Sequence, residues 1–404
     1  MSTLVTQPSG IVTSLLGTDL YKLTMLQALL TSHPDADGEY TFLCRSKTAY
    51  PLAELVDEVN AELDHLCTLS FSAEELARLR TLRFLKSHLI DFLSIFRFQR
   101  RFIEVTAEGN DLRVVAKGPI IHVMGFEIFV LQIVNELYFR RLPEQGVLDE
   151  ARRRLYDKIE LVKGCPEAMD PGDPFLFFDF GLRRRYSSAW QTEVATILAK
   201  ELPLNFRGTS NVQLAFNLGL TPIGTMAHEY LQAYQAFGFR LADSLKAALE
   251  GWVQEFRGDL GYALTDVVGL DAFLRYFDLY FAKLFDGLRH DSGDPFLFGE
   301  RCIDHYRSLR IDPLSKILTF SDSLDFVKAL ALFTHFRKRI RTNYGIGTFL
   351  MNDTPHAPLN IVMKLTRCNG QPVAKLSDSP GKTMCQDQEY VAYLRKVFSV
   401  PVPA

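Results

Sequence analysis

A histidine and an aspartate, His228 and Asp266, form the leading candidate pair for chemistry in this sequence. His228 follows an apolar run with small residues (PIGTMA), and Asp266 follows another apolar run (ALT). A neutral imidazole can act as a base or a covalent nucleophile when a carboxylate orients its second nitrogen. A lone histidine is more often a core residue bonded to a carbonyl. The predicted position of His228 at a strand end, among other polar strand ends, favours the chemical role.

A second cluster, RHDSGDP at residues 289–295, combines a cation, acids and a conformationally permissive glycine. Arg289 could bind a carboxylate or phosphate with two parallel donors, and Asp291 could bind ribose hydroxyls or a magnesium ion. The alternative is an ordinary Asp/Gly/Pro turn.

Two loops have residues suited to a phosphate group. The segment GIGT, which ends in Gly347 and Thr348, follows a predicted strand and could open a helix, whose N-terminal N–H groups favour anions. Ser321 and Asp322 end the preceding predicted strand, and adjacent loops of this kind often hold one phosphate in barrel folds. Taken alone, each loop could equally be a tight turn.

An aromatic residue and a cation, Phe180 and Arg183, lie close together in the segment FDFGLRRR. Such a pair could contact a flat anionic ligand, although consecutive arginines usually mark a solvated helix start. Ser210 or Asn211 could be the N-cap of a helix over residues 212–218.

The elements that must position these residues repeat one pattern between residues 175 and 350: a short apolar run, a polar burst, then a helix-like stretch. An apolar segment that turns polar only at its end is typical of a buried parallel strand. Chemistry in βα-barrels is located at the carboxyl ends of the strands. The pattern therefore predicts an α/β fold with an irregular, TIM-like βα-barrel as the catalytic domain, over residues 141–355.

The remaining segments predict an N-terminal α+β domain over residues 1–140. We expect a helix capped by Thr18 or Asp19 that ends at Leu30, a strand over residues 39–45, a helix opened by the capping box from Ser72 to Glu75, and a hairpin over residues 102–118. Near the C-terminus, strands over 359–365 and 372–376 flank Asn369-Gly370, a strong hairpin signal. Residues 356–404 should form this hairpin and a tail that packs back on the N-terminal domain.

Composition excludes several classes of protein. The net charge of the 404 residues is -3, which argues against a nucleic-acid-binding surface. The six cysteines are scattered without Cys-x-x-Cys spacing, as expected for free thiols in a reducing compartment. Residues 119–139 are apolar but are interrupted by several polar side chains, and the first residues lack the pattern of a secretory signal. We therefore expect a cytoplasmic protein that does not bind membranes.

Together, these motifs resemble the nicotinate phosphoribosyltransferase family, a group of type II phosphoribosyltransferases. The resemblance runs in one order from the segment TDLYK, residues 18–22, to the segment SDSPGK, residues 377–382. It implies condensation of nicotinate with 5-phosphoribosyl 1-diphosphate to nicotinate mononucleotide and diphosphate, in NAD biosynthesis by the Preiss–Handler route. It further implies ATP as a coupled substrate through a phosphohistidine, with Mg²⁺ carried by diphosphate groups rather than by protein ligands.

The resemblance also assigns roles to residues. His228 matches the phosphorylated histidine and Asp266 its orienting carboxylate, while Arg289 matches the residue that faces the substrate's carboxylate. In related enzymes one tyrosine that stacks on the pyridine ring comes from a neighbouring subunit, which would make the site a property of a homodimer; the sequence leaves both the monomer and the dimer open. The remaining matches are Tyr21 and Phe180 for the ring, Ser210 for its pocket, Asp291 for ribose, Arg183 for phosphate or diphosphate, Ser321, Asp322, Gly347 and Thr348 for the 5-phosphate, and Lys364 and Lys375 for the ATP phosphates.

Alternatives to nicotinate as the substrate remain at this point. Nicotinamide-using relatives have an aspartate where this chain has Ser210, and a quinolinate enzyme would need neither ATP nor the pair His228 and Asp266. A non-catalytic binding protein would be expected to lose residues such as Arg289 and Asp291. The sequence departs from the family pattern at Leu182, where threonine is usual, and at residues 267–269.

Overall fold

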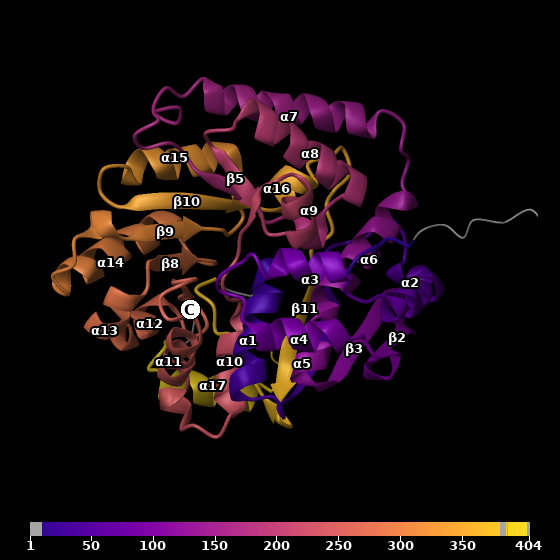
Figure 1. Ribbon diagram of the computed structural model, residues 1–404, viewed down its shortest axis with the longest axis horizontal. Coiled ribbons are helices and arrows are strands. Elements are labelled where there is room, and N and C mark those ends of the chain that lie inside the picture. The colour runs from indigo at the N-terminus through magenta and orange to yellow at the C-terminus, as the bar shows by residue number, and fades with distance from the viewer. Residues whose placement is uncertain (1–9, 380–384, 386, 402–404) are drawn as a thin grey trace, which may run out of the picture.

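The computed structural model describes residues 10–379, 385 and 387–401, and it contains two β-sheets surrounded by helices (Figure 1). The N-terminal sheet has the strand order β12-β11-β1-β3-β2, and the second sheet has the order β6-β5-β4-β10-β9-β8-β7. The strands are β1 Asp37–Cys44, β2 Ile103–Glu108, β3 Asp111–Pro119, β4 Phe177–Asp179, β5 Phe206–Thr209, β6 Thr221–Pro222, β7 Tyr262–Leu264, β8 Gly287–His290, β9 Ile317–Phe320, β10 Arg341–Ile346, β11 Ile361–Cys368 and β12 Gln371–Pro372.

The helices lie outside both sheets and between them; in Figure 1, α14 and α15 lie beside the seven-stranded sheet and α1 and α10 lie near the centre. Their bounds are α1 Leu20–Ser32, α2 Val56–Thr68, α3 Ala73–Leu79, α4 Ser87–Ile95, α5 Ile120–Val123, α6 Phe126–Arg140, α7 Val147–Lys163, α8 Ser188–Glu201, α9 Val212–Asn217, α10 His228–Ala233, α11 Ser244–Phe256, α12 Leu270–Tyr276, α13 Leu279–Leu284, α14 Pro295–Ser308, α15 Phe326–Phe336, α16 Thr348–Met351 and α17 Gln388–Val397.

All neighbouring strands of the seven-stranded sheet run parallel, which confirms the predicted βα-barrel-like architecture. The sheet is curled but open, because β6 and β7 are its two edges among the described residues. A side-chain hydrogen bond crosses the opening, from Thr225 Oγ1 after β6 to the carbonyl of Tyr262 on β7, at 3.2 Å. The sheet therefore forms an incomplete barrel. The loops at the carboxyl ends of its strands nevertheless lie around one cavity.

The antiparallel sheet confirms the α+β character of the N-terminal region and the return of the chain's end to it. β11 pairs with β1, so that Lys364 lies opposite Thr41, and β2 and β3 form the predicted hairpin. The expected capping box of Ser72 and Glu75 opens α3. Helix α1 begins after Asp19 as expected and ends two residues later than predicted, but the Asp19 side chain makes no capping hydrogen bond.

The second strand of the C-terminal hairpin is much shorter than expected. We predicted residues 372–376, whereas β12 covers only Gln371–Pro372. Beyond it the chain crosses to the barrel, where the N–H groups of Leu376 and Ser377 donate to the carbonyls of Val267 and Asp266 at 2.7 and 3.1 Å. Residues 372–376 are mostly apolar, as a strand would be, but the end of this segment forms its hydrogen bonds with loops of the seven-stranded sheet.

The tail beyond the hairpin contacts the barrel. Helix α17 packs near η5 (Leu241–Asp243), and Tyr390 Oη donates to Gln235 Oε1 at 2.9 Å. These contacts are with residues that we assigned to the catalytic domain. The domain boundaries at 140 and 355 stay predictions.

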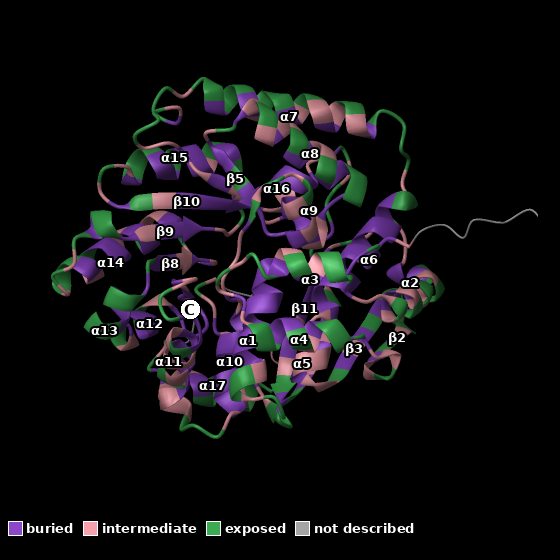
Figure 2. Ribbon diagram, in the orientation of Figure 1, coloured by how far each residue is buried: buried purple, intermediate pink, exposed green. Residues whose placement is uncertain are grey.

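Residues 120–140 are long and apolar enough to cross a membrane by length and composition, but 83% of the apolar window is buried within the protein. Figure 2 shows α6 largely in the colour of buried residues. Its position fits a core helix, and its buried polar side chains, including Glu127 and Asn135, face other parts of the chain.

Candidate active site

A cavity of about 470 Å³ lies at the carboxyl ends of the parallel strands and is closed on one side by β11 and the start of α1. It gathers every site residue proposed from the sequence except Asp266, which lies behind His228. The lining residues among those proposed are Tyr21, Phe180, Arg183, Ser210, His228, Arg289, Asp291, Ser321, Asp322, Gly347, Thr348, Lys364 and Lys375.

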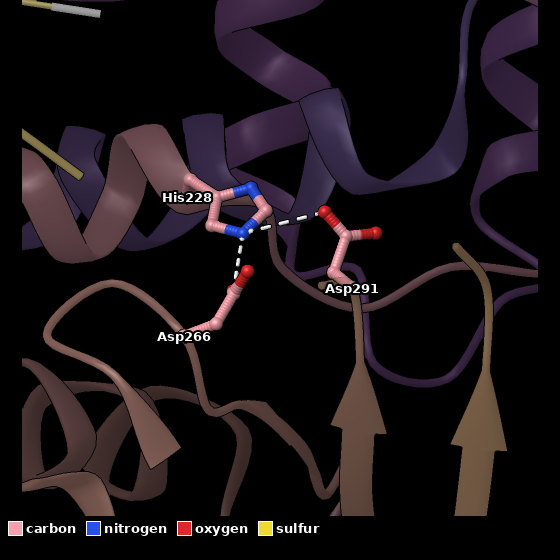
Figure 3. Close-up of side chains that lie close together, drawn as sticks. All are labelled: His228, Asp266 and Asp291. Atoms are coloured by element: carbon pink, nitrogen blue, oxygen red, sulfur yellow. Dashed lines mark hydrogen bonds and ion pairs between the residues drawn. The ribbon is translucent and has the colours of Figure 1, made fainter. Parts of the chain in front are cut away.

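His228 is the first residue of helix α10, not the end of a strand as we predicted. Strand β6 ends at Pro222, and a loop carries the chain from there to the helix. His228 Nε2 lies 2.7 Å from Asp266 Oδ1 and 3.4 Å from Asp291 Oδ2 (Figure 3). Nδ1 lies on the opposite side of the ring and has no hydrogen-bond partner among the described residues. The carboxylates therefore hold the proton on Nε2 and leave the Nδ1 lone pair available.

The charge balance around His228 keeps the imidazole neutral and the carboxylates ionised. Burial lowers the pKa of His228 and the adjacent Lys375 lowers it further, against the opposing effect of Asp266. Burial raises the pKa of Asp266, but the combined effect of His228 and Lys375 brings it well below its ordinary value. Lys375 Nζ lies 2.6 Å from Asp266 Oδ2, and Ser292 Oγ donates to the same oxygen at 2.5 Å.

The trio His228, Asp266 and Asp291 offers three atoms within 4.8 Å of one another that could bind a metal ion. Lys375 Nζ contacts both carboxylates, at 2.6 Å from Asp266 and 3.6 Å from Asp291. An ammonium group in this position already neutralises the acids. The donor set therefore does not fit a resident metal ion. That Mg²⁺ arrives with its diphosphate ligand stays a prediction.

The predicted ring pocket is formed by Tyr21, Phe180, Ser210 and Arg289. Phe180 packs directly on Gly345, where an added Cβ would lie 2.2 Å from the phenylalanine ring. Arg289 Nη1 donates to the carbonyl of Met226 at 3.1 Å, and its buried Nε has no partner among the described residues. Tyr21 and Phe180 of the same chain both line the cavity, and their predicted roles at the ring, like the predicted homodimer, stay predictions.

Asp19 is a site residue that sequence reasoning missed. It was interpreted only as a helix cap, but its buried carboxylate lines the cavity and lies 3.9 Å from Arg183 Nε. Burial raises the pKa of Asp19, against the effect of Arg183 and a contact with Ser210. The signal in the sequence was a cap residue next to Tyr21, and a cap alone does not predict a ligand contact.

The two loops that we predicted to hold a phosphate group border the same cavity. Ser321 follows β9, and its Oγ donates to the carbonyl of His290 and to Asp291 Oδ1, at 3.0 and 3.1 Å. Gly347 and Thr348 lie at the start of the short helix α16, after β10. Both loops line the cavity, together with Asp322.

A basic wall faces these loops. It contains the predicted Lys364 from β11 and two arginines, Arg45 and Arg184, that we did not single out. Burial lowers the pKa of Lys364 to about 8, because the nearby Glu127 only partly offsets the loss of hydration. Arg184 Nε donates to the carbonyl of Ile361 at 3.2 Å, which joins the wall to β11.

Departures from the family pattern are accommodated by packing. Leu182 is fully buried, and Val267 and Val268 are nearly so. In the segment 377–382, Ser377, Asp378 and Ser379 lie near the barrel loops, whereas Pro380, Gly381 and Lys382 lie outside the described residues.

Comparisons with known proteins agree with this geometry. Residues 175–402 match the nicotinate phosphoribosyltransferase (NAPRTase) family, and residues 16–135 match the N-terminal domain of that family. A nicotinate phosphoribosyltransferase of Herminiimonas arsenicoxydans is 64% identical over 391 residues, which cover 97% of this chain and 98% of the relative. One of Chromobacterium violaceum is 59% identical over 396 residues, which cover 98% of each.

A solved structure gives the same result at lower sequence identity. The crystal structure of nicotinate phosphoribosyltransferase from Vibrio cholerae is similar with a TM-score of 0.90 and 36% identity, covering 98% of this chain and 96% of that chain. With this coverage, the match extends over both sheets. The chain therefore belongs to the nicotinate phosphoribosyltransferase family.

Proposed function

We propose that this chain condenses nicotinate with 5-phosphoribosyl 1-diphosphate and couples the reaction to ATP hydrolysis through phosphorylation of His228. Family membership supports the transfer reaction and its place in NAD biosynthesis. One observation carries the coupling: a neutral, buried histidine is held by Asp266 through Nε2 and leaves Nδ1 unpaired among the described residues. The site is lined by cations and loops suited to three anionic substrates.

Phosphorylation follows from this geometry. The Nδ1 lone pair attacks the γ-phosphorus of ATP, the bond to the β-phosphate oxygen breaks, and ADP leaves. The proton on Nε2 stays shared with Asp266, which stabilises the positive charge that develops on the ring. Lys375 and Lys364 are suited to the phosphate oxygens. The phosphoryl group adds about two negative charges beside Asp291 and so changes the affinity of the site for diphosphate.

Transfer of the phosphoribosyl group requires positioning more than covalent chemistry from the protein. The pyridine nitrogen attacks C1 of the ribose as the bond to diphosphate breaks, and positive charge builds on the sugar, as in glycosyl transfer. Tyr21 and Phe180 would hold the ring, and Asp291 the ribose hydroxyls. The loops with Ser321 and Gly347 would hold the 5-phosphate. Mg²⁺ accompanies the diphosphate groups as part of the substrates.

Nicotinate is favoured over nicotinamide by the charges in the ring pocket. Ser210 is neutral, and Arg289 has a free buried donor at Nε that suits a carboxylate. A quinolinate enzyme would have no use for the paired His228 and Asp266. We propose a reaction in the cytoplasm that involves neither nucleic acid nor membrane, with any homodimer assembling around sites that already contain Tyr21.

The test is the intact mass of the purified protein after incubation with Mg-ATP, compared with His228→Ala. We expect a gain of one acid-labile phosphoryl group that is absent from the variant. The variant should also retain slow transfer without ATP coupling. No gain in the unchanged protein would refute the coupling through His228. A gain in both proteins would place the phosphoryl group on another residue.

A further inference from the structure

Glu127 is a buried acid that contacts cations from three separate parts of the fold. Its Oε2 lies 2.7 Å from Lys22 Nζ on α1, while its Oε1 accepts from Arg183 Nη1 at 3.0 Å and lies 4.0 Å from Lys364 Nζ on β11. Its side chain is only 5% exposed. Two of the three cations, Arg183 and Lys364, line the cavity.

Arg183 and Lys364 have no other carboxylate among the described residues that interacts with them as closely as Glu127 does. Arg183 lies 3.9 Å from Asp19, and Lys22 also pairs with Glu229, the neighbour of His228. Lys364 is favoured in its charged form by Glu127 and, more weakly, by Asp291; Arg183 and Lys375 oppose that form. Glu127 is thus the principal carboxylate facing Lys364.

A buried carboxylate is costly to desolvate unless cations and hydrogen bonds compensate it. The position of Glu127 in the first turn of α6 adds a favourable interaction with the helix N-terminus. If the carboxylate were neutral, Arg183 would keep only the more distant Asp19 and Lys364 only the weaker attraction of Asp291. The repulsion between these two partly buried like charges would then be less compensated. The pKa of Lys364 would then fall further, and Arg183 would lose the charged acceptor that orients its guanidinium group.

We propose that Glu127 is a positioning residue: its carboxylate is the shared counter-ion that holds Arg183 and Lys364 charged and oriented toward phosphate groups in the cavity. The assignment of those two cations to phosphate rests on the proposed function. Glu127 itself does not touch substrate in this arrangement. It acts by joining α6, β11 and the loop after β4 into one basic wall.

Titration of Lys364 measures this role without any substrate. The Lys364 side chain is 31% exposed, so its amine can be labelled competitively with acetic anhydride across a pH series and quantified by peptide mass spectrometry. We expect Glu127→Gln to lower the midpoint of Lys364 from about 8 by about one pH unit, the lower end of the effect of a charge at this range. Glu127→Asp keeps the negative charge but, with a side chain one methylene shorter, places it farther from Lys364, and should therefore lower the titration midpoint of Lys364 by less.

A matched control is Glu136→Gln on the same helix. Glu136 is also buried, but it pairs with Arg140 and Arg185, neither of which lines the cavity. This variant should leave the Lys364 midpoint unchanged, with a comparable change in melting temperature. If Glu127→Gln does not fold, Glu127→Asp carries the same measurement.

Activity then separates the inference from the proposed function. With Glu127→Gln at neutral pH, we expect the KM values for ATP and phosphoribosyl diphosphate to rise about tenfold, with a smaller change in kcat, because binding cations are lost rather than the nucleophile. An unchanged Lys364 midpoint in both Glu127 variants overturns the inference. A lowered midpoint with unchanged KM values supports Glu127 as the counter-ion and instead refutes the assignment of Lys364 to substrate phosphates.

Discussion

Replacing Asp266 with asparagine should slow the phosphorylation of His228 severely while preserving the shape of the side chain. Lys375 Nζ, which can only donate, lies 2.6 Å from Oδ2, so the amide oxygen must take that position. The amide NH₂ then faces His228 Nε2, at the place where Oδ1 accepts its proton at 2.7 Å. This arrangement favours the tautomer with the proton on Nδ1, the atom that attacks phosphorus in the mechanism that we propose.

The size of the effect follows from the cost of restoring the reactive tautomer. Losing a hydrogen bond to a charged acceptor costs about 1.5–3 kcal/mol, and leaving a buried donor unpaired costs about 1–3 kcal/mol. At about 1.36 kcal/mol per tenfold, the sum corresponds to a loss of roughly 10²- to 10⁴-fold in rate. Asp291 Oδ2, 3.4 Å from Nε2, is an alternative acceptor and favours the lower part of this range.

The assay is the rate of acid-labile phosphoryl incorporation from Mg-ATP, followed by intact mass under single-turnover conditions. Asp353→Asn is the control, because Asp353 pairs with Arg154 and Lys158 outside the cavity. Transfer without ATP should change little in Asp266→Asn. A phosphorylation rate within about threefold of the unchanged protein would refute the argument that Asp266 selects the tautomer.

Three further predictions concern substrate recognition. Ser210→Asp adds a second carboxylate beside Asp19 and should raise the KM for nicotinate at least tenfold relative to that for nicotinamide; an unchanged ratio would remove this position from specificity. Gly345→Ala places a Cβ 2.2 Å from the Phe180 ring and should raise the KM for nicotinate and lower stability by about 1–3 kcal/mol, measured by denaturation. Lys364 has a pKa of about 8 and loses its charge as pH rises, so the KM for ATP should increase above pH 8. In Lys364→Arg the KM for ATP should stay low to higher pH. A KM for ATP that is constant up to pH 9.5 in the unchanged protein would contradict a role of Lys364 in binding ATP phosphates.

The parts of the site that were predictable from sequence lie at the ends of buried strands. Asp291 and Ser321 directly follow the strands β8 and β9, and parallel strands bring their carboxyl ends to one edge of the sheet whatever the conformation of the loops. The position of His228 was less predictable, because β6 has only two residues and ends at Pro222, so the loop, not the strand, sets where α10 begins. The pairing of His228 with Asp266 still followed from the order of the motifs.

The residues that were missed depend on contacts between distant segments. Glu127 lies within an apolar helix, and its partners on α1, β11 and the loop after β4 are far away in sequence. The only local signal was an acid that interrupts a core helix, which predicts a buried partner but not its identity. Residues 373–376 were predicted as a strand because they are mostly apolar, but only Val373 donates to β11, at the carbonyl of Thr366, whereas Leu376 donates to the barrel loop at Val267.

The crossing of residues 373–377 from one sheet to the other has a consequence for synthesis of the protein. The cavity is closed by Asp19 and Tyr21 from the start of the chain, and by Lys364 and Lys375 from its end. A ribosome must therefore synthesise the chain at least as far as Lys375 before both lysines can meet His228. A shorter nascent chain lacks part of the cavity lining, so the phosphorylation of His228 that we propose requires a chain that extends through Lys375.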